Sequence, residues 1–189
     1  MDERIKVVAT QILSRAWGTL TLATLDYRHA NGTWQRQSRE IYDHGNAVAI
    51  ILFDPARRTV LLTRQYRHPV SLNGDPAWLI EACAGLLDED DKLSGVMREA
   101  LEETGHRPRD VQWLFDAYMS PGSLTERLSL FVGHYDAGTR IAPGGGLAAE
   151  GEEIEVLEMR LDDALAGIGS GAIIDAKTIM LLHWLALNR

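Results

Sequence analysis

Four charged residues, Arg98, Glu99, Glu102 and Glu103, lie close together in a segment with a helical pattern. Glu99 and Glu103 are four residues apart, so they are neighbours on a helix surface, where like charges cost about 0.2–0.5 kcal/mol. A cation among the carboxylates would remove this repulsion, and hard cations such as Mg²⁺ prefer oxygen ligands. The alternative is a solvated acidic face. The spacing therefore indicates either a metal site or a charged helix surface.

A longer pattern surrounds this cluster. Residues 98–105, Arg-Glu-Ala-Leu-Glu-Glu-Thr-Gly, follow Gly85 and resemble the signature of the Nudix hydrolases. That signature has a glycine, five residues, Glu, seven residues, and then Arg-Glu-apolar-x-Glu-Glu-x-Gly-apolar. The chain departs from it in three ways: the gap after the glycine is one residue shorter, Asp90 or Asp91 replaces the first Glu, and His106 occupies an apolar position.

Other segments resemble one group of this family, the GDP-mannose pyrophosphatases, which are close to the ADP-ribose pyrophosphatases. These segments are residues 81–88, 118–122, 38–40 and 64–67. The shortened gap is usual in that group, and Pro121 is shared with enzymes of the ADP-ribose type. The similarity extends from the residues around Ile12 to those around Lys177.

The resemblance implies a set of metal ligands. They are the backbone carbonyl of Ala84 and the side chains of Glu99, Glu103 and Glu152. Glu150 and Glu153 remain competitors for the loop position of Glu152, because this loop is longer than usual in the group. The implied cofactor is Mg²⁺, with Mn²⁺ as a substitute.

The resemblance also implies substrate contacts. They are Trp17, Ser38, Arg39, Glu40, Arg64, Arg67, Ala84, Glu126 and Lys177. An aromatic face suits a flat base, although Trp17 could instead anchor the N-terminal segment. Arginine binds a diphosphate in a bidentate manner, although Arg64 and Arg67 could be ordinary edge-strand charges.

The implied reaction is hydrolysis of a nucleoside diphosphate sugar, with GDP-mannose and water giving GMP and mannose 1-phosphate. Glu103 and Arg98 are expected in the catalytic set, with Arg98 orienting the helix glutamates. Glu152, with Glu126 behind it, is the candidate general base. One alternative is ADP-ribose pyrophosphatase activity, giving AMP and ribose 5-phosphate. Another is a non-catalytic nucleotide-sugar sensor.

The elements expected to position these residues are strands around a central helix. Asn31-Gly32 predicts a hairpin turn between strands at 19–28 and 33–42. The apolar runs at 46–53 and 59–66 predict a better buried hairpin. Further strands are expected at 79–84, 111–117, 128–135 and 154–159, with the first of these ended by Gly85.

The central helix is expected to run from a cap at Asp90 or Asp91 to about Thr104, with Gly105 at its C-terminal cap. Leu93, Met97 and Leu101 recur at spacing four, with Val96 and Ala100 beside them, and this stripe is expected to be core. Two more helices are expected at 161–167 and 175–187. The glycines at 144–146 are interpreted as a mobile loop that brings in Glu152. These elements predict a Nudix-type α/β/α sandwich (α/β or α+β) with a mixed sheet.

The chain has 189 residues, 46% of them hydrophobic, and one cysteine. We expect a single domain over 1–189, with an N-terminal antiparallel β-ribbon at 1–44 and a catalytic core at 45–189. The resemblance implies that the ribbon makes a homodimer. No apolar run approaches the roughly 20 residues of a membrane span, and Cys83 fits a buried thiol in a reducing compartment. These features predict a cytoplasmic protein without a membrane partner.

The formal net charge of −8 disfavours nucleic acid as a partner. The acidity is concentrated in two segments. Residues 85–105 contain seven acidic and two basic side chains, and residues 144–158 contain five acidic and no basic ones. The basic residues assigned to phosphate lie elsewhere. The distribution therefore fits a phosphate-bearing ligand held by a metal on one side and by basic side chains on the other.

Overall fold

A computed structural model describes residues 2–87 and 91–189, which form two compact units. The first contains the residues up to Asn46 together with Tyr118–Arg127, and the second contains Ala47–Ala117 and Leu128–Arg189. Asp88 and Asp90, which the sequence patterns singled out, lie outside the described residues, and so does the side chain of Glu150. No helix of the described part is long and apolar enough to cross a membrane.

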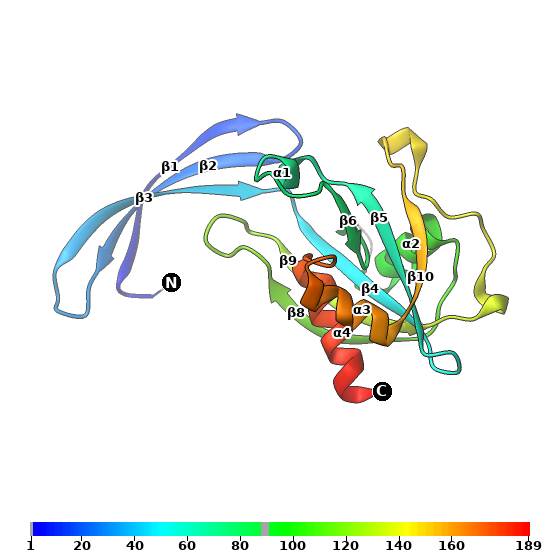
Figure 1. Ribbon diagram of the computed structural model, residues 1–189. Coiled ribbons are helices and arrows are strands. Elements are labelled where there is room, and N and C mark those ends of the chain that lie inside the picture. Colours follow the sequence, from blue (N-terminus) through cyan, green and yellow to red (C-terminus); the bar gives the residue numbers. More distant parts are fainter. Residues whose placement is uncertain (1, 88–90) are drawn as a thin grey trace. The chain divides into compact units, whose positions relative to one another are not determined.

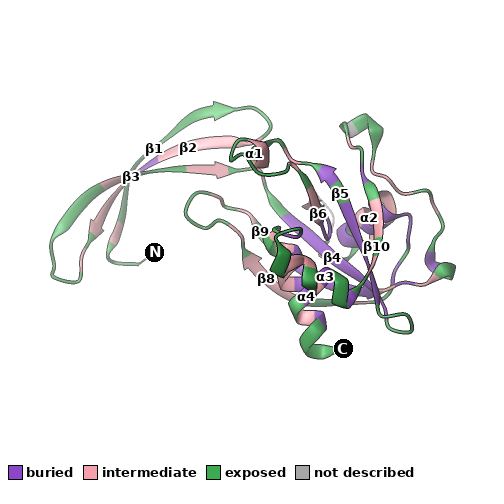
Figure 2. Ribbon diagram, in the orientation of Figure 1, coloured by how far each residue is buried: buried purple, intermediate pink, exposed green. Residues whose placement is uncertain are grey.

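The first unit is built on a three-stranded antiparallel sheet in the order β1-β2-β3. Its strands are β1 (Ile5–Arg15), β2 (Thr19–Arg28) and β3 (Trp34–Asp43). The predicted turn between β2 and β3 is confirmed: Gly32 has a φ of 88°, and the Asn31 side chain accepts a hydrogen bond from the Thr33 amide. β1 was not anticipated, because nearly all of its residues are exposed and no alternation marks a buried face (Figure 2).

A mixed seven-stranded sheet forms the centre of the second unit (Figure 1). The order is β10-β5-β4-β9-β8, with β6 paired to β5 and β7 to β4. Its strands are β4 (Asn46–Asp54), β5 (Thr59–Tyr66), β6 (Trp78–Glu81), β7 (Cys83–Leu87), β8 (Arg109–Tyr118), β9 (Arg127–His134) and β10 (Glu155–Arg160). β4 and β9 are parallel, whereas β5 is antiparallel to β4, β6 and β10.

Helices cover both faces of this sheet. Val48 and Ile50 of β4 pack in one cluster with Val96 and Ala100 of α2 (Lys92–Thr104). Because side chains alternate along a strand, Ile51 points to the opposite face, where it is also fully buried. α3 (Leu161–Ser170) and α4 (Ala176–Asn188) lie on that side (Figure 1). The predicted sandwich is confirmed.

The remaining helical segments are α1 (His68–Ser71) and the 3₁₀ turns η1 (Ala137–Thr139) and η2 (Ala148–Glu150).

The ends of α2 follow from local chemistry. The Asp91 side chain accepts hydrogen bonds from the amides of Leu93 (3.0 Å) and Ser94 (3.1 Å). Gly105 ends the helix in the left-handed conformation, at a φ of 76°, where a side chain would be strained. The predicted helix, its cap at Asp91 and its end at Gly105 are confirmed.

The predicted core stripe of α2 is confirmed at Val96 and Ala100 and is wrong at Leu93. Leu93 is 50% exposed and Met97 only partly buried, whereas Val96 and Ala100 are fully buried. Two adjacent stripes on a helix share the same spacing of four, so spacing alone could not choose between them. The correct face also buries Glu103, which the charge pattern had placed on the polar side.

Gly85 does not end a strand as predicted. The predicted strand at 79–84 is divided at Ala82: β6 pairs with β5, and β7, which contains Gly85, pairs with β4. The chain thus changes its neighbouring strand from β5 to β4 just before Ala84. In the same region, α1 follows Arg67 where only a loop was expected.

Candidate functional site

Glu103 is a buried carboxyl group at the centre of the acidic cluster. It is 1% exposed, and its Oε2 accepts a hydrogen bond from the Ala84 amide at 3.3 Å. Burial is the largest cause that raises the pKa of Glu103 to about 8; the negative charges of Glu99 and Glu152 act in the same direction, and hydrogen bonds from Cys83 and Ala84 oppose them. The Glu103 carboxyl group therefore retains its proton at neutral pH unless a cation replaces it.

Arg98 pairs with the other two glutamates of α2. The Arg98 guanidinium lies 2.9 Å from Glu99 Oε1 and 3.2 Å from Glu102 Oε2, so it holds two of the three helix glutamates. A Cβ atom at Gly85 would overlap the Glu99 carboxylate. Glycine at this position lets the helix carboxylate approach the backbone of β7 beside Ala84.

The glycine-rich loop is fastened to the C-terminal end of α2. The Gly145 amide donates to the Glu103 carbonyl (2.8 Å) and the Gly146 amide donates to the Glu102 carbonyl (3.1 Å). These carbonyls have no partner inside a helix that ends here. A Cβ at Gly146 would also overlap the Glu152 carboxylate. The glycines thus bring Glu152 towards Glu103 by docking, which the interpretation as a mobile loop did not anticipate.

The predicted ligands supply only oxygen donors, the carboxylates of Glu99, Glu103 and Glu152 and the Ala84 carbonyl, which is the donor set that a hard divalent cation prefers. The negative charges of Glu99 and Glu152 both act to raise the pKa of Glu103, so the three carboxylates are close enough to repel one another. In residues 2–87 and 91–189 no group of three acidic, histidine or cysteine side chains is already arranged to hold a metal ion. Glu152, for example, accepts a hydrogen bond from the Leu147 amide at 2.9 Å. The donors fit a cation in chemistry and charge, and their side chains would have to turn to bind it.

A second buried carboxylate, Glu81, joins two predicted substrate contacts. Arg67 Nε donates to Glu81 Oε2 at 2.7 Å, and Lys177 Nζ donates to Glu81 Oε1 at 2.6 Å. Lys177 also bonds Asp175 at 3.0 Å. Burial acts to lower the pKa of Lys177, but the carboxylates of Glu81 and Asp175 outweigh it and raise that pKa. In the sequence, Glu81 stood out only as part of a resemblance and had no assigned role.

Asp175, which bonds Lys177, also caps the N-terminus of α4. Asp175 accepts hydrogen bonds from the Thr178 amide (3.0 Å) and hydroxyl (2.6 Å), which caps the helix. The Thr178 hydroxyl accepts a hydrogen bond from the Ala82 amide at 2.6 Å, so it donates one hydrogen bond and accepts another. This contact anchors the chain two residues before Ala84.

The remaining predicted contacts, apart from Arg64, belong to the first unit. Trp17 is 71% exposed and stacks on His44, with ring centroids 4.9 Å apart. His44 Nε2 lies 3.8 Å from Glu126 Oε2. Trp17 thus presents an accessible aromatic face, and its ring packs against His44. Sequence reasoning did not single out His44. Ser38, Arg39 and Glu40 are all exposed on β3.

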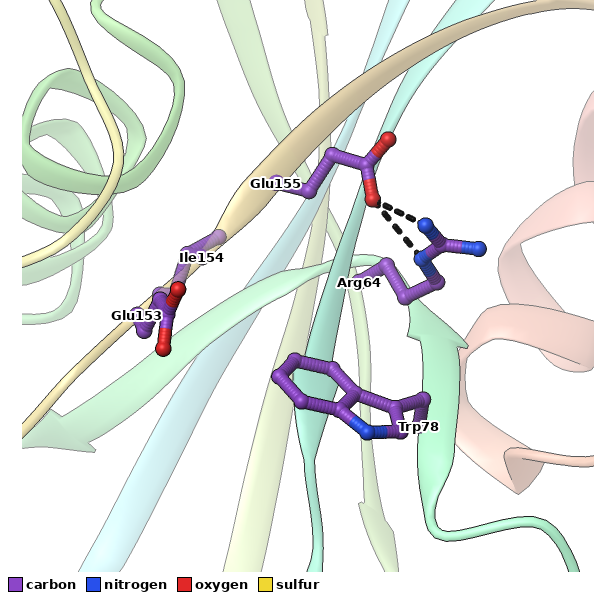
Figure 3. Close-up of a pocket in the computed structure, with 5 residues that line it drawn as sticks. All are labelled: Arg64, Trp78, Glu153, Ile154 and Glu155. Atoms are coloured by element: carbon purple, nitrogen blue, oxygen red, sulfur yellow. Dashed lines mark hydrogen bonds and ion pairs between the residues drawn. The ribbon is translucent and has the colours of Figure 1, made fainter.

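Arg64 lines a cavity of about 470 Å³ in the second unit (Figure 3). Its other lining residues are Trp78, Glu153, Ile154 and Glu155. Arg64 Nε donates to Glu155 Oε2 at 2.8 Å, across the register of β5 and β10. Glu153, one of the competitors for the metal position, therefore lies at this cavity.

Two family models match consecutive parts of the chain. The model of the GDP-mannose pyrophosphatase NudK N-terminal domain matches residues 4–42, and that of the NUDIX domain matches residues 43–182. A protein of Pectobacterium atrosepticum named GDP-mannose pyrophosphatase is 46% identical over 97% of this chain and 94% of its own length. Proteins of the same name from Cronobacter sakazakii and Yersinia enterocolitica are each 42% identical, over 100% of this chain and 98% of their own length.

Proposed function

The chain belongs to the Nudix hydrolase family, and because its full-length relatives are named GDP-mannose pyrophosphatases, we propose that it hydrolyses GDP-mannose to GMP and mannose 1-phosphate. The match of a group-specific N-terminal model to residues 4–42 carries this choice of substrate. The buried Glu103 carboxyl group, with two further carboxylates acting on it, supports the chemistry.

Glu99, Glu103 and Glu152, with the Ala84 carbonyl, are the residues proposed to hold divalent metal. Mg²⁺ is the proposed ion, with Mn²⁺ as a substitute. When bound, such an ion neutralises diphosphate charge and lowers the pKa of a coordinated water.

The protein's own groups position the substrate. Arg67 and Lys177 are proposed to bind the diphosphate, and their shared partner Glu81 fixes where their charges lie. Arg98 holds Glu99 through a charge-assisted bond and is a positioning residue. Glu152 is proposed as the general base, with Glu126 as the second candidate, since each has a carboxylate able to accept a proton from water.

The first unit is proposed to have two roles. Trp17 presents the exposed face suited to a nucleobase, and Ser38, Arg39 and Glu40 present polar groups on β3. The exposed apolar residues Val7, Val8, Ile12 and Leu13 of β1 support the proposal that this sheet makes a homodimer. A cytoplasmic location is also proposed, supported by the single buried thiol of Cys83.

The test is a substrate panel with the purified protein and Mg²⁺, in which the nucleotide products are resolved by chromatography. We expect GDP-mannose to give GMP at a higher kcat/KM than ADP-ribose gives AMP. Activity about tenfold higher on ADP-ribose would refute the assignment. Glu103→Gln is expected to abolish turnover and keep the fold, whereas unchanged turnover would remove Glu103 from the mechanism.

A further inference from the structure

His106 occupies a position where the Nudix signature has an apolar residue, yet its side chain is buried, with the residue 8% exposed. Its Nδ1 lies 2.9 Å from the hydroxyl oxygen of Thr139, which is also buried. We propose that His106 is a positioning residue that fixes, through Thr139, the register of the loop that carries Glu152. This inference rests on the proposed function, in which Glu152 binds the metal and accepts a proton from water.

The segment that joins β9 to β10 runs antiparallel to the C-terminal end of α2. The Arg107 amide donates to the Thr139 carbonyl at 2.8 Å, and the Ile141 amide donates to the Gly105 carbonyl at 2.9 Å. The glycine amides described above continue this ladder towards Glu152. The position of Glu152 therefore depends on which loop residue lies opposite which residue of the helix end.

Backbone hydrogen bonds by themselves do not choose that register. Every residue except proline offers the same donor and the same acceptor, so a shifted loop can form equivalent bonds. Registers are specified weakly where glycine is frequent, and residues 144–146 of this loop are all glycine. A contact between two side chains belongs to one register only. The bond between His106 and Thr139 is such a contact, and it joins the helix end to the start of the loop.

Both side chains of this contact are held in place. The Thr139 hydroxyl donates to the Asp136 carbonyl at 2.8 Å and accepts from the Asp136 amide at 3.1 Å. Its remaining lone pair faces His106, so we assign Nδ1 as the donor. The His106 ring meets the ring of Tyr135 edge to face, with centroids 5.4 Å apart at 87°. Because Tyr135 belongs to the core cluster, the imidazole cannot turn away without opening that packing.

The first experiment measures loop docking in the metal-free protein by hydrogen–deuterium exchange. His106→Phe keeps a ring against Tyr135 and loses the donor. Amides of residues 139–147 should then exchange about threefold to tenfold faster, while those of β4 and β9 exchange as in wild type. His106→Asn, whose amide nitrogen can donate in place of Nδ1, should restore most of the protection. Thr139→Val removes the acceptor and serves if His106→Phe does not fold, and Thr139→Ser should stay close to wild type.

The second experiment measures the binding of Mn²⁺ alone by calorimetry. Molecules with the loop in another register do not present Glu152, so the apparent affinity falls with the fraction in the competent register. We expect His106→Phe to bind Mn²⁺ at least about threefold more weakly and His106→Asn to recover most of this loss. A purely structural role would lower the denaturation midpoint and leave the Mn²⁺ affinity unchanged.

A matched control is His134→Phe, since His134 lies on β9 and its Nδ1 is 3.3 Å from Asp110 Oδ2. It should match wild type in both measurements. Exchange of residues 139–147 at the wild-type rate in His106→Phe would overturn the proposal, and so would faster exchange with unchanged Mn²⁺ affinity. Absence of GDP-mannose hydrolysis by wild type would refute the proposed substrate instead, because neither measurement uses it.

Discussion

Glu103→Gln should make the metal-free protein more stable, and increasingly so as the pH rises. The pKa of Glu103 in the folded protein, about 8, is above its ordinary value of 4.5. At pH values between these two pKa values, the folded protein keeps a proton that the unfolded chain has released. Stability conferred by this proton is complete below the unfolded pKa and is lost as the pH rises through about 8. Glutamine cannot titrate, and its side-chain oxygen can still accept from the Ala84 amide.

The size of the effect follows from the shift. At 1.36 kcal/mol per pKa unit, the full span corresponds to about 5 kcal/mol, and the part between about pH 6 and pH 8.5 is about 2–3 kcal/mol. The free energy of unfolding is measured by urea denaturation in the presence of EDTA. The stability of Glu103→Gln minus that of wild type should rise by about this amount across the interval, because contributions from groups that do not interact with Glu103 cancel in the difference.

Glu102→Gln is the matched control, since Glu102 is on the same helix but its side chain is 26% exposed. Its difference from wild type should not change with pH in this way. A difference for Glu103→Gln that stays constant within about 0.5 kcal/mol, or that falls with pH, would refute the claim that burial and neighbouring charge hold the Glu103 proton. Added Mg²⁺ should stabilise wild type and have much less effect on Glu103→Gln.

The packing around the site makes three more substitutions informative. Gly85→Ala places a Cβ on the Glu99 carboxylate and should lower kcat by at least about tenfold while circular dichroism stays native; Gly122→Ala, in open space, should have no effect, and equal activity of both would contradict the close approach. Glu81→Gln removes the counter-charge of two basic side chains and should raise KM more than it lowers kcat, with a stability loss of about 1–3 kcal/mol by urea unfolding; an unchanged KM would show that those side chains do not bind substrate. Thr178→Val leaves the buried Ala82 amide without an acceptor and should cost about 1–3 kcal/mol, whereas a loss below about 0.5 kcal/mol would mean that this bond does not anchor the strand.

Local features of the sequence were sufficient for most of the fold. The apolar runs of β4 and β5, the Asn31-Gly32 turn and the two ends of α2 were predicted because each depends on interactions within a few residues. Spacing along one helix likewise placed Glu99 and Glu103 together from the sequence alone. Periodicity, turn conformation and capping act locally, so they can be read along the chain.

Tertiary packing decided what those residues can do. The orientation of α2 on the sheet buried Glu103 and exposed Leu93, although both stripes have the same spacing. Lys177 meets Glu81 across 96 positions of sequence, and no local pattern marks that pairing. Glu152 approaches Glu103 because glycine amides bind the last carbonyls of α2. Burial and long-range charge pairs exist only after the layers pack, and they set the proton affinity and the position of the groups proposed for catalysis.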